Sequence, residues 1–454
     1  MRYVLDHSLQ VLSDGRQVMG GSPLRIFKLT EGGVNMLQRV RNGDDLPRNV
    51  LIDRLVDGGA IHPKPATGGP FCAAEVTFVV PAYGPVTIGD LGPRMIVVDD
   101  ASPAGRPVAP AHAVVLRRST NGGPGAARMT GLAQVTTALV AFVDADVTVH
   151  DGWLDGLVAH LSDDRVALVA PRVLTLAGDG ALARFESSRS PLDLGPEPAR
   201  VRARTRVSYV PSAALLARTD ALRNVAGFDT TLRTGEDVDL VWRLVDAGFT
   251  VRYEPDVVVH HAPRADLASW LRQRQGYGQS AGPLARRHPG ALAPLGVSGW
   301  SAGVWGLLAL GQVVPAAVVS GWTAAALMKK LPDLPRRTAL DLVRHGHLGA
   351  GRQIASAIGR AWWPLALVAA LVSRRARRAV LAAVLLPPLQ DWYRKRPNLD
   401  VTRYVGLRIA DDAAYGWGLW QGAWRARTTE PLAPDFTSWP RPSRFEQRRP
   451  ASVA

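Results

Sequence analysis

Two aspartates one residue apart, Asp144 and Asp146, directly follow the apolar run from Ala138 to Val143. Such a run is typical of a buried strand, so both carboxylates are expected where this strand ends. A hard cation such as Mg2+ takes one or two carboxylates from a protein and its other oxygens from phosphates and water. The spacing therefore suits a site that holds a cation against a diphosphate, although a solvated turn shows the same short pattern.

Three earlier runs rich in β-branched residues are also predicted to be strands, at residues 76–80, 95–98 and 113–116. Strands that alternate with helical segments predict an α/β fold with a mostly parallel sheet, whose ligand crevice lies beyond the carboxyl ends of the strands. Three polar groups fall at such ends, namely Pro81-Ala82-Tyr83, Asp99-Asp100 and Asp144-Ala145-Asp146. We therefore expect them to share one rim of the sheet.

A second acidic group, Glu236 and Asp237, precedes a stretch with helical spacing of Leu240 and Leu244. Carboxylates at the start of a helix are favoured by the helix dipole and by free amide groups, so a simple capping role is one interpretation. The other is a general base that deprotonates an attacking hydroxyl. The residues alone leave both interpretations open.

Five motifs together resemble the family 2 glycosyltransferases with a GT-A fold, over about residues 74–270. In chain order they are Val80-Pro81-Ala82-Tyr83, Val98 to Ser102, Asn121 to Arg128, Asp144-Ala145-Asp146 and Gly235 to Leu240. The wider layout resembles the mycofactocin biosynthesis glycosyltransferases. No G-x-G-x-x-G motif follows the first strand, which disfavours a dinucleotide-dependent oxidoreductase.

The resemblance implies a UDP-sugar donor and a Mg2+ or Mn2+ ion. Asp146 is the firmer metal ligand, and Asp144 contacts metal or ribose. The positions expected to bind the donor are Pro81, Tyr83, Asp99, Asp100, Arg128, Asp144 and Ala145. Tyr83 would pack against the base, and Asp100 or Asp99 would accept from base or ribose. Arg128 has an alternative interpretation as an ordinary arginine on a helix surface.

The resemblance also assigns the base role to Asp237, with inversion by a single displacement and with Glu236 and Asp239 positioning the acceptor or the helix. Relatives carry a metal-site histidine after the strand that here ends in His260 and His261. Only one of two neighbouring strand residues faces the crevice, and the spacing favours His261. The basic and aromatic segment Trp270 to Tyr277 is expected to close over the diphosphate, as the corresponding loop does in relatives. It departs from the Q-x-x-R-W pattern of processive synthases.

The ends of the chain differ in character from this central part. Residues 1–62 show short strands around glycine turns and then two helices. That order resembles winged-helix elements that bind a precursor peptide at a sheet edge, although a stabilising extension is an alternative. A Pro- and Gly-rich linker is predicted at residues 63–73, and the glycosyltransferase domain at 74–288. The fold class is therefore α/β, a GT-A nucleotide-diphospho-sugar transferase with a Rossmann-like mixed sheet.

The last third is expected to associate with a membrane. No charged residue occurs from Pro289 to Met328, and basic residues flank this segment on both sides, which favours a helical hairpin or interfacial helices over one simple crossing. Residues 289–330 are therefore predicted as apolar helices and 331–430 as a basic amphipathic helical region. Within the latter, Arg374 to Arg378 split an apolar region, residues 361–373 and 379–389, a pattern that resembles interfacial helices. Residues 431–454 are predicted to be an irregular tail.

The composition agrees with a basic protein at an anionic surface. The 454 residues carry a net charge of +15, and the single Cys72 excludes an internal disulfide. No nucleic-acid-reading motif appears. We expect an enzyme at the cytoplasmic face of the membrane that moves a hexose, in particular glucose, onto a peptide-derived redox cofactor. The alternatives are a cell-envelope glycosyltransferase and a non-catalytic peptide-binding scaffold.

Overall fold

The computed structural model describes residues 1–12, 15–66, 71, 75–264 and 266–438. The chain divides into two compact units. Unit 1 comprises Met1–Ala177 and Arg189–Pro263, and unit 2 comprises Gly178–Ser188 and Arg264–Ala454. The sequence placed residues 178–188 and 264–288 in the glycosyltransferase domain, whereas their contacts group them with unit 2.

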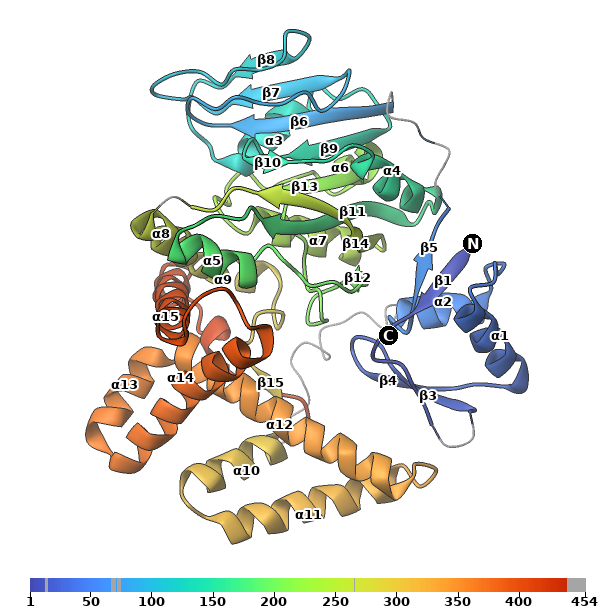
Figure 1. Ribbon diagram of the computed structural model, residues 1–454, viewed down its shortest axis with the longest axis vertical. Coiled ribbons are helices and arrows are strands. Elements are labelled where there is room, and N and C mark those ends of the chain that lie inside the picture. Colours follow the sequence, from blue (N-terminus) through green and yellow to red (C-terminus); the bar gives the residue numbers. More distant parts are fainter. Residues whose placement is uncertain (13–14, 67–70, 72–74, 265, 439–454) are drawn as a thin grey trace. The chain divides into compact units, whose positions relative to one another are not determined.

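Unit 1 is built on a mixed nine-stranded sheet (Figure 1). Its strands are β6 (Val76–Ala82), β7 (Met95–Asp99), β8 (Val114–Arg117), β9 (Leu139–Val143), β10 (Val147–Thr148), β11 (Val166–Thr175), β12 (Ala199–Val201), β13 (Ala214–Arg218) and β14 (Thr250–His261). Their order is β10-β14-β11-β13-β9-β6-β7-β8, and β12 pairs with β14. The four strands β8, β7, β6 and β9 run parallel, so their carboxyl ends meet at one edge.

The sheet is mixed because β13 runs antiparallel to both of its neighbours, β9 and β11. All five residues of β7 and of β9 are buried, which explains why these strands are continuous apolar runs without alternation. The short helical segments of unit 1 in this part are α3 (Pro124–Leu132), α4 (Trp153–Val158), η2 (Ala159–Ser162), α6 (Thr219–Asn224) and α7 (Glu236–Asp246).

The first 64 residues form a small part of unit 1 with its own apolar core. Its elements are β1 (Arg2–Leu5), β2 (Gln10–Val11), β3 (Gln17–Gly20), β4 (Arg25–Lys28), α1 (Glu31–Asn42), α2 (Val50–Asp57) and β5 (Ile61–Lys64). Strands β2, β3 and β4 form an antiparallel sheet, and β1 pairs with β5. The winged-helix resemblance remains a prediction.

The predicted linker begins two residues too early, because Pro63 and Lys64 pair with Tyr3 and Arg2 in the β1–β5 ladder. Most of its remainder, including Cys72, lies outside the described residues. Buried Asp6 ties this small part to the rest of unit 1: it contacts His62 (2.8 Å) and accepts from Arg206 Nη2 (2.7 Å). The Asp6 carboxylate thus connects His62, near the end of this small part, with Arg206 in the rest of unit 1.

Unit 2 is helical. Its helices are α5 (Ala181–Ser188), α8 (Leu267–Gln279), α9 (Ala281–Arg287), α10 (Gly299–Ala309), α11 (Val313–Lys330), α12 (Arg336–Arg360), α13 (Trp363–Val372), α14 (Arg374–Lys395), α15 (Val401–Arg425) and η3 (Glu430–Leu432). A short parallel pair joins β15 (Gly296–Val297) to β16 (Asp435–Phe436), so the predicted irregular tail begins with an ordered segment. Residues 439–454 lie outside the described part.

Helix α8 corrects one prediction, because the segment from Trp270 to Tyr277 is a helix and not a loop. Trp270 and Arg274 are buried, and Arg274 pairs with Glu186 of α5 and with Asp411 of α15. Trp270 Nε1 donates to the same Glu186 (2.9 Å). These side chains therefore hold three helices of unit 2 together.

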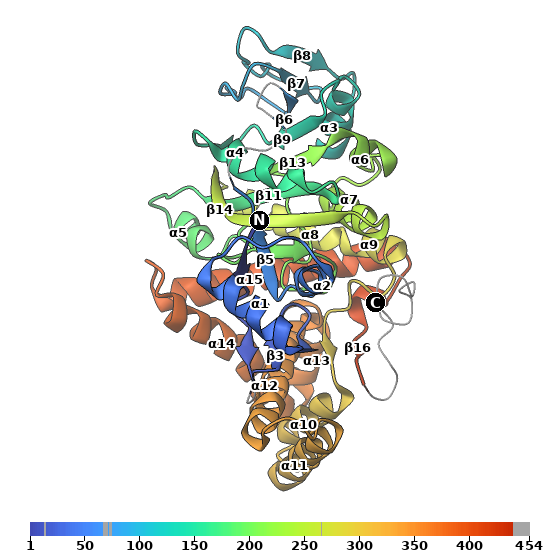
Figure 2. The same ribbon diagram turned by 90° about the vertical axis from the view of Figure 1, so that its right-hand side faces the viewer.

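The apolar segment 289–328 contains α10 and α11, which lie side by side as a hairpin (Figures 1 and 2). The run Arg374 to Arg378 lies between the two apolar stretches and forms the first turns of α14, and the break between α13 and α14 is at Ser373. Among the described residues, no single helix is long and apolar enough to cross a membrane. The bent pair α12 and α13, which meet at 89°, passes that test by length and composition when taken together.

Candidate active site

The carboxyl ends of β6 and β7 are joined by a dense set of hydrogen bonds around Asp99. Its Oδ1 accepts from Ser102 N (2.9 Å) and Ser102 Oγ (2.6 Å), and its Oδ2 accepts from Arg117 Nη1 (2.5 Å). Burial opposes ionisation of Asp99, but these donors outweigh it and lower its pKa. Gly84 N donates to Ser102 Oγ (2.8 Å), so the turn after β6 depends on the same serine.

Asp100 holds the loop that leads into α3. Its Oδ1 accepts from Arg118 Nε (2.8 Å) and from Gly122 N (3.1 Å), and its Oδ2 accepts from Gly123 N (2.7 Å). Gly123 is the N-cap of α3, so this carboxylate fixes where that helix begins. Both side-chain oxygens thus accept hydrogen bonds from the protein. Asp100 therefore stabilises this loop, a role that the sequence did not predict.

The arginines that hold these two aspartates were missed from the sequence, although a signal was present. Arg117 ends β8 and is paired in register with Asp99 of β7, and Arg118 follows it. Two adjacent acids at the end of a buried strand require donors, because burying a charge without a partner is costly. The Arg-Arg pair at the end of β8 supplies the donors that the Asp-Asp pair at the end of β7 requires.

Arg128 of α3 is the centre of the site. Only 1% of this residue is exposed, and its guanidinium joins two carboxylates: Nη2 donates to Asp144 Oδ1 (2.5 Å) and Nη1 to Glu236 Oε1 (2.9 Å). Its interpretation as a helix-surface arginine is therefore wrong. One side chain connects the end of β9 to the start of α7.

Close approach of the two helix starts makes this bridge possible. A Cβ atom on Gly125 would lie 3.1 Å from Glu236 Cγ, tighter than ordinary contact, so a glycine lets α3 come near α7. Arg233, just before α7, also donates to the side-chain and main-chain oxygens of Asn121 (3.3 and 3.1 Å). The motif around residues 121–128 and the motif around 235–240 are thus one structural element in space.

The charges of this cluster shift one another. Burial alone would lower the pKa of Arg128, but Asp144 and Glu236 outweigh it and raise that pKa. Burial and then the Asp237 carboxylate raise the pKa of Glu236 to about 7. Burial also raises the pKa values of Asp144 and Asp237. Carboxyls with raised pKa values beside a buried cation are common at active sites, because proton transfer needs a pKa near the working pH.

Asp237 lies at the second position of α7, whose N-cap Gly235 has a left-handed φ of 79°. Its Oδ2 accepts from Ser212 N (3.3 Å) and its Oδ1 from Val238 N (2.8 Å). Asp239, two residues on, faces another way: it is buried and accepts from Arg243 Nε (2.8 Å). Asp239 therefore positions the helix, whereas Asp237 shares the charge cluster of Arg128.

Asp146 and His261 are brought together by the pairing of β10 with β14. Val147 is paired with His261, and His261 Nε2 lies 3.3 Å from Asp146 Oδ2. The Asp146 side chain is 38% exposed. His260 faces the other side and contacts His150 instead, with Nε2 of His150 3.0 Å from its Nδ1. Of the two histidines, His261 is the one beside the aspartate pair.

The remaining expected donor positions lie along the same edge. Pro81 and Ala82 end β6, Tyr83 follows with 59% of its surface exposed, and Ala145 lies between the two aspartates. The exposed ring of Tyr83 can offer a face for stacking, whereas Pro81 contributes to the strand pairing with Val98. The predicted donor-binding residues therefore lie at one edge of the sheet. Several of them, such as Asp99 and Asp100, form hydrogen bonds within the protein and do not face solvent.

A divalent cation fits this arrangement only together with a substrate. In the described part of the chain, no group of three or more Asp, Glu, His or Cys side chains gathers to hold a metal ion alone. Mg2+ and Mn2+ sites in such enzymes draw further oxygens from phosphates and water, so one or two carboxylates with a histidine are a sufficient protein share. Asp146 and His261, whose Oδ2 and Nε2 atoms lie 3.3 Å apart, can offer this share, whereas Asp144 Oδ1 accepts from Arg128 Nη2.

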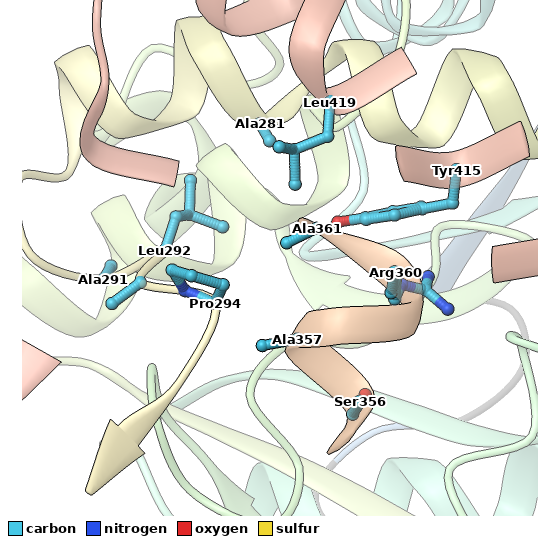
Figure 3. A pocket seen from close by; sticks show the side chains of 11 residues that line it. Ala281, Ala291, Leu292, Pro294, Ser356, Ala357, Arg360, Ala361, Tyr415 and Leu419 are labelled. Carbon is cyan, nitrogen blue, oxygen red and sulfur yellow. The ribbon is translucent and has the colours of Figure 1, made fainter. Parts of the chain in front are cut away.

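A separate pocket of about 230 Å³ lies within unit 2 (Figure 3). It is lined by apolar side chains such as Leu292, Pro294 and Leu419, together with Arg360 and Tyr415. The Arg360 guanidinium stacks 3.6 Å from the Tyr415 ring centroid and donates to Asp412 (3.1 Å). The residues that line this pocket include no carboxylate, so it offers neither a metal ligand nor a base.

Comparison with known proteins identifies the class. Residues 90–222 match the family model described as Glycosyl transferase family 2. This match covers part of unit 1 and, with the mixed α/β sheet, points to a GT-A type glycosyltransferase.

The relatives narrow the identity. Over 461 aligned residues, the chain is 40% identical to the pre-mycofactocin glycosyltransferase of Mycobacterium tuberculosis, in strains CDC 1551 / Oshkosh and H37Rv, covering 95% of this chain and 97% of that protein. The chain therefore belongs to the glycosyltransferase family 2 enzymes, in the family of the pre-mycofactocin glycosyltransferase, and is an enzyme.

More distant similarities were also found. Glycosyltransferase AglE of Haloferax volcanii is 30% identical over 140 residues, 31% of this chain and 44% of that protein. Among solved structures, the mannosyltransferase PcManGT from Pyrobaculum calidifontis, in complex with GDP-Man and Mn2+, is 17% identical with a TM-score of 0.34 and covers 62% of this chain and 87% of that one.

Proposed function

We propose that this enzyme transfers a hexose, in particular glucose, from a UDP-sugar to a hydroxyl of a peptide-derived redox cofactor, with inversion at the anomeric carbon. The observation that carries the proposal is the 40% identity along almost the whole length of a pre-mycofactocin glycosyltransferase. The cluster of Arg128 with Asp144 and Glu236, beside Asp237, supports the chemistry.

Asp237 acts as the base in this proposal. Its carboxylate takes the proton of the acceptor hydroxyl as the acceptor oxygen forms a bond to the anomeric carbon and the bond from that carbon to the diphosphate breaks. UDP leaves with the electron pair of the broken bond. Burial raises the pKa of Asp237, which makes its carboxylate a better proton acceptor than an exposed aspartate.

Arg128 is a positioning residue in this scheme. It holds Asp144 at the end of β9 and Glu236 at the start of α7, so the donor side and the acceptor side of the site share one fixed guanidinium. Asp146, His261 and Asp144 would hold a Mg2+ or Mn2+ ion, which when bound supplies positive charge against the departing diphosphate. Tyr83 offers its exposed ring to the base.

Product analysis tests the proposal. The purified full chain is incubated with Mn2+ and UDP-glucose, in parallel with a peptide-derived acceptor of the mycofactocin type and with a lipid-linked sugar, and products are weighed by mass spectrometry. The proposal predicts hexose addition to the peptide-derived acceptor and a β-linkage by NMR. Transfer to the lipid-linked sugar alone would support a cell-envelope enzyme instead. If UDP-glucose is not consumed in either reaction, the result would support a non-catalytic scaffold.

A second measurement examines the metal residues. Replacing Asp146 by Asn removes a carboxylate that faces solvent, so we expect the Mn2+ concentration for half-maximal activity to rise by about tenfold or more, as is typical for loss of a metal-site residue. Asp90→Asn, an exposed change in the loop after β6, is the matched control and should leave the Mn2+ requirement unchanged.

A further inference from the structure

The hairpin of α13 and α14 keeps its apolar side chains at the surface. The two helices pack against each other, yet α13 has no buried residue. Leu371 and Val372 at the end of α13 are 72% and 84% exposed. The large aliphatic residues exposed along the two helices are Leu365, Leu367, Val368, Leu371, Val372, Leu381, Leu385, Leu386 and Leu389. So many exposed large aliphatic side chains on one hairpin indicate an interaction site, because their exposure to water is unfavourable.

The same hairpin carries a concentrated positive charge. Arg374, Arg375, Arg377 and Arg378 are all exposed in the first turns of α14, next to the exposed end of α13. Between residues 342 and 390 the sequence has seven arginines and no aspartate or glutamate. The partner of this surface must therefore accept aliphatic side chains and many cationic groups at once.

An anionic lipid bilayer has that chemistry. Its boundary region takes up aliphatic side chains of an amphipathic helix, while its phosphates attract arginines that lie at the same level. An acidic protein could match the charge, but nine exposed aliphatic side chains beside the arginines would then need a matching apolar groove. A fluid bilayer meets both demands without such a shape.

The position of the arginines decides how the hairpin lies. They lie in the first turns of α14, directly after Ser373, which connects α13 to α14 at the tip of the hairpin. Figure 1 shows the two helices. Insertion with the tip leading would carry four guanidinium groups into hydrocarbon, which is costly. Helix α13 has 10 residues, which at 1.5 Å each span about 15 Å, half of a hydrocarbon core of about 30 Å.

We propose that the α13–α14 hairpin binds the surface of an anionic bilayer and lies in the plane of its interface. The leucines and valines enter the boundary between headgroups and acyl chains, and the four arginines at the tip contact lipid phosphates. This places the enzyme on the membrane without a requirement for a crossing, and it does not depend on the identity of the sugar donor or acceptor.

Vesicle co-sedimentation of the full-length enzyme tests the proposal. The expected result is binding to vesicles of phosphatidylcholine with phosphatidylglycerol, and binding at least about tenfold weaker to phosphatidylcholine alone, since each basic residue near an anionic surface adds to the attraction. The quadruple change R374Q/R375Q/R377Q/R378Q should weaken binding to the anionic vesicles by about tenfold or more. The Lys versions of all four should retain most of it, because charge is kept.

Two controls separate the hairpin from general basicity. A matched variant removes four exposed basic residues elsewhere, in unit 1: K28Q/R41Q/R54Q/R106Q. It should bind anionic vesicles within about twofold of wild type. The variant L371S/V372S alters only exposed side chains, so it should fold normally and should weaken binding even at high salt, where the electrostatic part is screened.

Three results would overturn the proposal. One is equal binding by the Gln variant and by wild type. Another is binding of a single-stranded oligonucleotide with the same arginine dependence and no binding of vesicles, which would make the surface a nucleic-acid site. The third is an enzyme in cell membranes that resists extraction by alkaline carbonate, which would indicate a crossing segment. Glycosyl transfer in solution by the Gln variant shows that folding is intact in each case.

Discussion

The two units place charged and apolar side chains in opposite and equally unusual positions. In unit 1 the guanidinium of Arg128 lies inside the protein between Asp144 and Glu236, whereas in unit 2 the hairpin α13–α14 exposes nine large aliphatic side chains. A buried charge and an exposed apolar patch both carry a cost that packing alone does not explain. We propose that the first arrangement serves chemistry on a polar substrate and that the second serves attachment to a bilayer.

A similar contrast exists within the edge of the sheet. Both oxygens of Asp100 accept from groups of the protein, whereas the side chain of Asp146 is 38% exposed beside His261. Aspartates at the ends of neighbouring strands thus divide into those that hold the loops and those that are partly open to solvent. Four predictions test these contrasts, beginning with the largest effect.

Loss of the proposed base should have the largest effect. Asp237→Asn keeps the shape of the side chain but cannot accept the proton, so we expect kcat to fall by about 10²- to 10⁴-fold while the apparent affinity for the UDP-sugar stays within about threefold. Steady-state kinetics measure both. Asp246→Asn at the other end of α7 is the matched control and should keep normal turnover. If the Asp237→Asn enzyme is active, Asp237 is not the base, and the capping interpretation of the carboxylates at the start of α7 would be correct.

Removal of the buried cation should cost stability. Arg128→Gln leaves Asp144 and Glu236 without their shared partner, and breaking a buried pair in this way costs about 3–5 kcal/mol of unfolding free energy. Arg128→Lys keeps the charge but not the two-pronged geometry, so its loss should be smaller. Urea unfolding followed by fluorescence measures both, and the double variant R128Q/E236Q should recover part of the loss. Wild-type stability in Arg128→Gln would contradict the role of the bridge.

Unit 2 depends on close contacts between helix backbones as well as on its buried ion pairs. Gly418 of α15 faces the carbonyl oxygen of Gln275 of α8 so closely that a Cβ atom would overlap it, whereas Gly406 of the same helix meets no atom within 4 Å. Gly418→Ala should destabilise unit 2 by about 1–3 kcal/mol, the usual range for overpacking. Gly406→Ala should stabilise it by about 0.5–1 kcal/mol, because alanine favours a helix. Thermal unfolding of the two variants gives the comparison, and equal changes would argue against this packing.

Acid should weaken the small N-terminal part of unit 1. Burial alone would raise the pKa of Asp6, but contacts with His62 and Arg206 outweigh it and hold it well below 3.8, while burial lowers the pKa of His62 below 6.5. Both pKa values are lower in the folded chain than in the unfolded chain, so the unfolded chain takes up protons at a higher pH. The stabilising contribution is therefore complete above about pH 6.5 and is lost as the pH falls. Each unit of pKa difference is worth about 1.4 kcal/mol.

Pulse proteolysis of the full chain at pH 7 and pH 5, followed at cleavage sites within residues 1–64, measures this effect. The pKa of His62 governs this pH range, so His62→Gln should flatten the pH dependence. Asp44→Asn, at a side chain that is 43% exposed, should leave it as in wild type. Slower cleavage at pH 5 than at pH 7 would reverse the sign that we expect.

The sequence predicted much of the sheet and its edge, because strands buried on both faces are continuous apolar runs that end in polar residues. Asp99, Asp100, Asp144 and Asp146 were located at strand ends by that signal alone. The choice between His260 and His261 followed from strand alternation, and the structure places His261 next to Asp146. Local patterns of this kind need no knowledge of distant contacts.

Other features depend on contacts between distant segments and could not be predicted in the same way. The bridge by Arg128 joins residues 108 positions apart, and nothing around it distinguishes it from a helix-surface arginine. The helix α8 was taken for a loop because Trp270 and Arg274 look like ligand-binding residues until Glu186 and Asp411 are placed beside them. The arginines between residues 374 and 378 divide two apolar stretches in the sequence, but the pattern did not show that they begin α14, although arginine is a good helix former.

The central claim is that the acids at the edge of the sheet form one site for donor and acceptor. A crystal structure of the enzyme with Mn2+, UDP and an acceptor analogue tests it most directly, because the anomalous signal of manganese locates the ion independently of the protein. The account predicts manganese in direct contact with the Asp146 carboxylate and the diphosphate, and an acceptor hydroxyl within hydrogen-bond reach of Asp237. Manganese and nucleotide bound away from these two aspartates would contradict it.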